Sequence, residues 1–196
     1  MQRWRGVASH FNEDTSFDAT VFALMGMLVG LVALVIVAIT VWTFARLDAP
    51  ASLVFAIRIG LVLMLLSQVV GVQMIVEGGN TFGDQGALKV PHAFTLHAVQ
   101  VLPGLALLLL ASDFIERRRI EVLAVGAAGY TVLISSTMVQ TYSGRSPLDI
   151  GILASTLVLL GLGLLAVSVG LALRAATAHH RLRKPAANRT EAPRGP

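Results

Sequence analysis

The chain is a succession of five long apolar runs separated by short polar stretches. A helix that crosses about 30 Å of hydrocarbon at 1.5 Å per residue needs about 20 largely apolar residues. Five segments meet this requirement: 19–45, 51–76, 91–112, 122–142 and 150–173. The pattern predicts an all-α fold, a polytopic membrane protein built as a five-transmembrane-helix bundle. We expect an extracytoplasmic N-terminal segment (1–18), a transmembrane domain (19–174) and a disordered, basic cytoplasmic tail (175–196).

Composition agrees with a membrane protein. The chain is 55% hydrophobic and 13% charged, whereas soluble domains are roughly 45–50% apolar and about 25% charged. Cysteine is absent, so a metal or haem would have to use His, Met or carboxylate ligands. The net charge of +4 comes almost entirely from residues outside or at the edges of the spans, so no nucleic-acid partner is expected. Richness in Ala, Gly, Val, Leu and Arg indicates a bacterial source.

The distribution of basic residues predicts the orientation. Arg117, Arg118 and Arg119 lie between the third and fourth spans, and Arg174 and the basic tail follow the fifth. Cytoplasmic flanks are enriched in Lys and Arg, so we place the C-terminus in the cytoplasm and the N-terminus outside a bacterial cytoplasmic (inner) membrane. Arg58, inside the second span, is expected to snorkel towards the nearer interface.

A cleavable signal peptide is the competing interpretation of the first span, because Ala49-Pro50-Ala51 has the form of a cleavage site. However, the uncharged run 19–45 is far longer than an apolar signal core of about 7–15 residues. Cleavage would also leave the Arg117–Arg119 triplet outside. We therefore expect a retained helix.

The third span carries the chain's most unusual polar content. At about 100° per residue, His92, His97, Gln100 and Gly104 fall on one face of a helix. An imidazole or amide that faced lipid would lack a partner, so this face is expected to turn into the bundle.

Two other spans have a face of small and polar residues, for which helix packing is the default explanation. The faces consist of Gly60, Met64, Ser67, Gly71 and Met74 in the second span, and of Gly126, Gly129, Tyr130, Leu133, Thr137 and Gln140 in the fourth. In the predicted orientation, the hydrogen-bonding residues gather at the extracytoplasmic ends, and the inner halves are nearly all apolar. This pattern argues against a channel or a complete proton relay. It predicts an extracytoplasmic polar pocket centred on His97.

Three interpretations of this pocket stay open. In the first, the histidines are packing residues of a structural membrane subunit. In the second, His97 is an axial ligand of a b-type haem in a redox subunit, and Gly104 admits the macrocycle. Because His92 and His97 lie about 140° apart on one helix, the second ligand would be Met74, Met138 or His97 of the partner subunit. The predicted cofactor-binding set is His97, His92, Gln100, Met74, Gln73, Gly104, Thr137 and Gln140.

The third interpretation is a non-redox transporter or sensor for a small molecule or a divalent metal. Its predicted metal ligands are His92, His97, Glu77 and Asp84. Glu77 and Asp84 lie in the Gly-rich connector 77–91. This connector is either a lid over the pocket or a flexible link. Haem b is the first cofactor candidate. Expected partners are membrane lipids, the ligand or cofactor, and a second copy or a membrane complex.

No nucleotide-binding, zinc-protease or hydrolase motif is present, and the sequence does not decide whether the chain is an enzyme. The stretch HAFTLHAVQVLP, with the Gly-rich loop before it and a span that begins near AIRIG, resembles a pattern in uncharacterised bacterial multi-span membrane proteins. The resemblance covers residues 55–110 and implies no activity.

Overall fold

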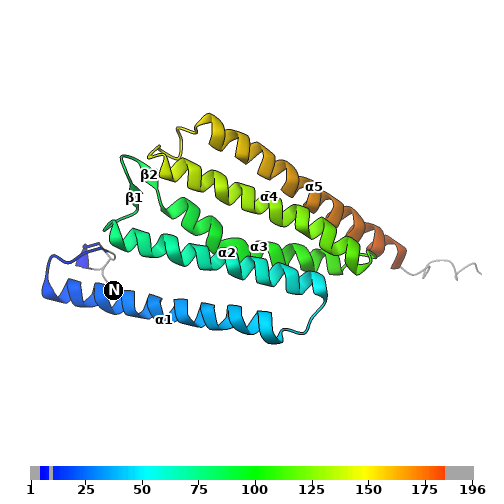
Figure 1. Cartoon of the computed structure of the whole chain (residues 1–196), viewed down its shortest axis with the longest axis horizontal. Coiled ribbons are helices and arrows are strands. Elements are labelled where there is room, and N and C mark those ends of the chain that lie inside the picture. Colours follow the sequence, from blue (N-terminus) through cyan, green and yellow to red (C-terminus); the bar gives the residue numbers. More distant parts are fainter. Residues whose placement is uncertain (1–4, 9–10, 184–196) are drawn as a thin grey trace, which may run out of the picture.

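The computed structural model describes residues 5–8 and 11–183. They form five long helices and a small hairpin (Figure 1). All five helices are long and apolar enough to cross a membrane, which confirms the prediction of an all-α, five-span membrane protein. The elements are α1 (Ser16–Arg46), α2 (Ala51–Val76), β1 (Thr81–Phe82), β2 (Gly86–Ala87), α3 (Lys89–Leu110), α4 (Glu116–Tyr142) and α5 (Ile152–Arg183).

The last helix is longer than expected. Residues 175–183 belong to α5, so the prediction that disorder begins at 175 is wrong. Five of these nine residues are Ala or Arg, which are good helix formers. His179 also pairs with Asp113 in the α3–α4 connection. Residues 184–196 of the predicted tail lie outside the described residues.

The helices pack as two pairs and one outlying helix. α2 packs along α3, α4 packs along α5, and α3 joins the two pairs by packing on α4. α1 packs mainly against α2 and lies at the edge of the bundle (Figure 1). Between the buried Asp18 and Thr40, no residue of α1 is buried. The central part of α1 is therefore only loosely covered by the rest of the chain.

Glycines set the closest helix approaches. A Cβ at Gly60 of α2 would lie 2.9 Å from the Val99 Cα of α3, and a Cβ at Gly129 of α4 would lie 2.8 Å from the Leu165 backbone nitrogen of α5. Real Cβ atoms do not come this near to backbone, so only glycine permits these approaches. Gly60 and Gly129, from the small-residue faces of the second and fourth spans, thus pack as predicted.

The two ends of the bundle differ in chemistry. We call the end with β1, β2 and the α4–α5 connection the hairpin end, and the end with Arg117–Arg119 and the α1–α2 connection the arginine end. At the arginine end, the Glu116 carboxylate accepts a 2.5 Å hydrogen bond from the backbone N–H of Ser52. Glu116 also pairs with Arg119 at 3.2 Å. These contacts join the starts of α2 and α4.

Arg58 of α2 is hydrogen-bonded to the end of α1. Its guanidinium donates to the carbonyl oxygen of Thr43 at 2.9 and 3.2 Å and to that of Phe44 at 3.2 Å. The guanidinium carbon also lies 4.9 Å from the centre of the Phe44 ring. The guanidinium thus reaches the last turn of α1 beside the nearer end of the bundle, which is the direction that snorkelling predicts, and its acceptors are protein carbonyls. Arg58 joins α1 to α2 near the arginine end.

Candidate functional site

The polar face of α3 does not point where the sequence predicted. The buried residues of α3 are Pro91, Thr95, Ala98, Leu102, Leu105, Ala106 and Leu109. His97, Gln100 and Gly104 are exposed, so the prediction that their face turns into the bundle is wrong. The opposite face, rich in Ala and Leu, fits the glycine surfaces of α2 and α4: a Cβ at Gly126 would lie 2.5 Å from Leu105 Cδ2. Small residues that permit close packing decide the orientation of α3.

His92, at the edge of this face, points instead towards α2. Its Nδ1 lies 3.0 Å from the backbone carbonyl oxygen of Ser67, and the Ser67 hydroxyl donates to the His92 carbonyl at 3.0 Å. Nδ1 also lies 3.0 Å from the Ser67 hydroxyl. Because that hydroxyl donates to the His92 carbonyl and the Ser67 carbonyl can only accept, these contacts fit the tautomer with the proton on Nδ1. Nε2 is then an acceptor with an available lone pair. Histidines that bind metals are commonly oriented by such a bond from the other ring nitrogen to a backbone carbonyl.

His92 lines a cavity of about 580 Å³ between α1 and α2, which we call the α1–α2 cavity. This volume is within the range of about 300–1,000 Å³ that is usual for small-molecule sites. The described lining residues include no Lys, Arg, Asp or Glu; they are Phe11, Phe22, Met25, Gly26, Leu28, Val29, Gly30, Ala33, Gln68, Gly71, Val72, Met74, Ile75 and His92. The site is thus an apolar space with a few polar groups.

Glycines and one amide shape this cavity further. A Cβ at Gly71 would lie 3.3 Å from the His92 ring, whereas a Cβ at Gly26 or Gly30 would have no atom within 4 Å. Gln68 makes no side-chain hydrogen bond within residues 5–8 and 11–183. The cavity therefore presents the Gln68 amide and the His92 imidazole as its hydrogen-bonding groups, next to the thioethers of Met25 and Met74.

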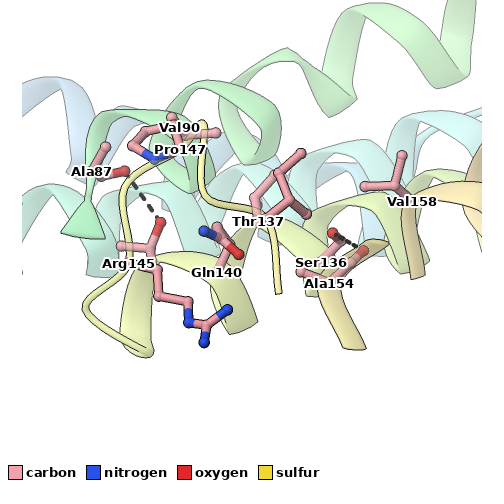
Figure 2. Close-up of a pocket in the computed structure, with 11 residues that line it drawn as sticks. Ala87, Val90, Ser136, Thr137, Gln140, Arg145, Pro147, Ala154 and Val158 are labelled. Carbon is pink, nitrogen blue, oxygen red and sulfur yellow. Dashed lines mark hydrogen bonds between the residues drawn. The ribbon is translucent and has the colours of Figure 1, made fainter. Parts of the chain in front are cut away.

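Thr137 and Gln140 lie at a different place, a pocket of about 120 Å³ beside the α4–α5 connection (Figure 2). The Gln140 amide nitrogen donates to the carbonyl oxygens of Ser146 and Asp149, both at 2.7 Å. Its amide oxygen accepts from the Gly151 N–H at 3.2 Å, and Thr137 donates to a carbonyl of its own helix. Gln140 thus organises the connection, and its hydrogen-bonding capacity is used.

The remaining predicted residues lie at the hairpin end. Gln73 accepts a hydrogen bond from the Tyr142 hydroxyl, and Glu77 and Asp84 are exposed. Among the described residues, no three His, Asp or Glu side chains come together as a metal site would require. The predicted metal ligands are therefore not assembled in this chain.

The connector 77–91 is held against the end of α4. Thr141 donates to the Ala87 carbonyl at 3.2 Å, and the Gln85 N–H donates to the Gly144 carbonyl at 3.1 Å.

The predicted set is thus divided among separate places. His92 and Met74 share the α1–α2 cavity, and His97, Gln100 and Gly104 lie on the exposed side of α3. Sequence reasoning missed Gln68 altogether, and it named Ser67 only as a packing residue. An amide in mid-span was a usable signal for Gln68, whereas the Ser67–His92 pairing depends on how α2 and α3 are aligned.

No protein-family model, curated protein or solved structure that was compared with this chain matches it. The resemblance of residues 55–110 to uncharacterised bacterial membrane proteins stays a prediction. Any functional conclusion must therefore come from the residues of the site.

Proposed function

We propose that this protein binds a largely apolar ligand or cofactor in the α1–α2 cavity, with His92 as the side chain that recognises or ligates it. The observation that carries the proposal is the hydrogen bond from His92 Nδ1 to the Ser67 carbonyl. It fixes the ring and leaves Nε2 as an acceptor in a residue that lines the cavity. Lipid offers an amide no hydrogen-bond partner, so the half-buried Gln68 amide, which makes no side-chain hydrogen bond among the described residues, supports the same conclusion.

Haem b is the first candidate. A neutral imidazole nitrogen is a common axial ligand of haem iron, and a methionine thioether is a common second one. His92 and Met74 both line the cavity, and the open surface at Gly26 and Gly30 leaves space for a flat ring. A bound haem would supply one-electron redox chemistry, while His92 and Ser67 would fix the position of the iron.

An uncharged, membrane-soluble molecule with a hydroxyl or carbonyl group is the second candidate. The absence of charged residues among the described lining residues favours it, because the two carboxylates of haem would need partners outside the cavity. Such a ligand could donate to His92 Nε2 and bond with the Gln68 amide.

Visible absorption of the purified full-length protein, with and without added haem, tests the proposal. Bound haem b should give a strong Soret band. His92→Ala should remove it or weaken haem binding at least tenfold, while the protein stays folded. His97→Ala is the matched control, because it removes an exposed imidazole of the same helix, and it should leave the spectrum unchanged.

If no Soret band forms, mass spectrometry of molecules that co-purify with the protein tests the second candidate. A neutral lipid-soluble species should be present with the natural chain and with His97→Ala, and absent with His92→Ala. If no chromophore or co-purifying molecule depends on His92, the proposal is wrong.

We also propose a bacterial cytoplasmic membrane, with the C-terminus inside and the hairpin end outside. Arg46 and Arg117–Arg119 lie at the arginine end, and excess basic charge in short flanks favours the cytoplasm. In this orientation His92 lies in the outer half of the membrane, where a ligand would reach it from the periplasmic leaflet.

A further inference from the structure

We infer that the exposed side of α3 is an interface between two copies of this chain, and that a reciprocal hydrogen bond between His97 and Gln100 holds the copies together. The interface surface, which we call the outward face of α3, consists of Phe94, His97, Gln100, Val101, Gly104 and Leu107, all exposed. It is separate from the α1–α2 cavity, so the inference does not depend on the proposed function.

The depth of the polar pair is the first argument. His97 lies a little over two turns from the start of α3, about 12 Å along an axis that rises 1.5 Å per residue, and Gln100 lies about 16 Å along it. The hydrocarbon layer is about 30 Å thick. Both side chains are thus placed well inside it and face away from their own bundle. Lipid tails offer an imidazole or amide no hydrogen-bond partner.

The second argument is that the pair cannot satisfy itself. His97 Nδ1 lies 2.8 Å from Gln100 Oε1, and neither side chain bonds to any other described residue. By contrast, the exposed hydroxyls of Thr131, Ser135 and Thr156 each donate to a carbonyl four residues earlier in their own helix. Those hydroxyls are compatible with lipid, whereas the His97–Gln100 pair has unused donors and acceptors.

The third argument is that these unused groups match a second copy of themselves. With Nδ1 as donor to Oε1, the pair retains the His97 Nε2 acceptor and the Gln100 N–H donors. If the amide is turned over, the retained groups become the His97 Nε2–H donor and the Gln100 oxygen acceptor. In either state each copy offers at least one donor and at least one acceptor. A two-fold axis along the membrane normal places the two pairs at the same depth, where they can bond reciprocally.

The surface around the pair permits a close approach. Gly104 lies on the same side of α3. A Cβ added there would have no atom within 4 Å, so no described part of the chain covers it. Membrane helices associate through small residues and interhelical hydrogen bonds, and the outward face of α3 combines both. A second copy of the chain carries the complementary hydrogen-bond donors and acceptors at the same depth, so no other protein is needed to cover this face.

Disulfide cross-linking in membranes tests this interface, since the chain has no cysteine and single ones can be introduced. Val101→Cys, on the outward face of α3, should form a covalent dimer when oxidised. Leu162→Cys is the control on α5, where the leucine is 51% exposed, and it should not. If cross-linking occurs only through Leu162, or through neither position, the inference is overturned.

The hydrogen-bonding pair is tested in the Val101→Cys background. Replacing both His97 and Gln100 by Leu should weaken dimerisation about tenfold, because two interhelical hydrogen bonds of about 0.7 kcal/mol each are lost together. Ser135→Leu, a polar-to-apolar exchange on the outer side of α4, should leave cross-linking unchanged. Dimerisation that survives the double replacement shows that the pair does not hold the copies together. The double variant should retain the His92-dependent ligand, which separates this inference from the proposed function.

Discussion

A guanidinium in an apolar helix is stable where a neighbouring helix ends, because the last turn of a helix has carbonyl oxygens without intrahelical partners. Arg58 uses this opportunity at Thr43 and Phe44. The sequence placed Arg58 inside a span but could not show that the end of α1 would return to its side. At the residue scale, the sequence showed which residues are polar but not which groups they hydrogen-bond to.

Arg58→Gln should lower the free energy of unfolding by about 1–3 kcal/mol, because the α1 carbonyls lose a charged donor. Thermal unfolding in detergent measures this as a lower Tm. Arg46→Gln is the control, since Arg46 is exposed near the same end of α1, and its effect should be smaller. Equal Tm values for the two variants would mean that the Arg58 contacts contribute nothing.

Hydropathy predicted the bounds of α1, α2 and α3 to within three residues, whereas α4 begins six residues earlier and α5 ends ten residues later than expected. Glycine spacing predicted the close approaches of α2 and α4. Gly60 contacts α3 and Gly129 contacts α5, as their positions on the small-residue faces predicted. The helical-wheel prediction for α3 was wrong because it assumed that His97 and Gln100 must be buried within their own chain. A single sequence does not distinguish burial inside the chain from burial between chains.

Gly129→Ala tests the α4–α5 packing. The added methyl group would meet backbone atoms of Leu165 and Gly161 at 2.8 and 2.9 Å, so the helices must separate, and stability should fall by about 1–3 kcal/mol. Unfolding by denaturing detergent provides the measurement. Gly163→Ala, where a Cβ would have nothing within 4 Å, should be neutral. A neutral Gly129→Ala would show that the close approach is not needed.

At the scale of the molecule, basic residues are concentrated at one end of the bundle. The Arg117–Arg119 triplet and the ion pair of Glu116 with Arg119 occupy the arginine end, whereas His92 and Gln73 lie towards the hairpin end. The sequence predicted this asymmetry because the arginine triplet and the polar residues at the span ends can each be read from a single segment. It could not predict the α1–α2 cavity, which depends on how loosely α1 is attached.

Fusions test the proposed orientation. A reporter that is active only in the cytoplasm should work after Pro196, and it should fail when inserted in the 143–148 connection. A reporter that is active only in the periplasm should behave in the opposite way. Cytoplasmic activity from the 143–148 insertion would reverse the orientation and place the hairpin end inside.

The weak attachment of α1 also has a kinetic consequence. One wall of the α1–α2 cavity is a helix without a buried residue between Asp18 and Thr40, and Arg58 holds only its far end. Swinging that wall outward would break few contacts, so the proposed apolar ligand would enter sideways from the lipid. Its entry rate would then follow its mole fraction in the membrane rather than its aqueous concentration. If the proposed ligand binds in the cavity, stiffer bilayers should slow its exchange without changing its affinity.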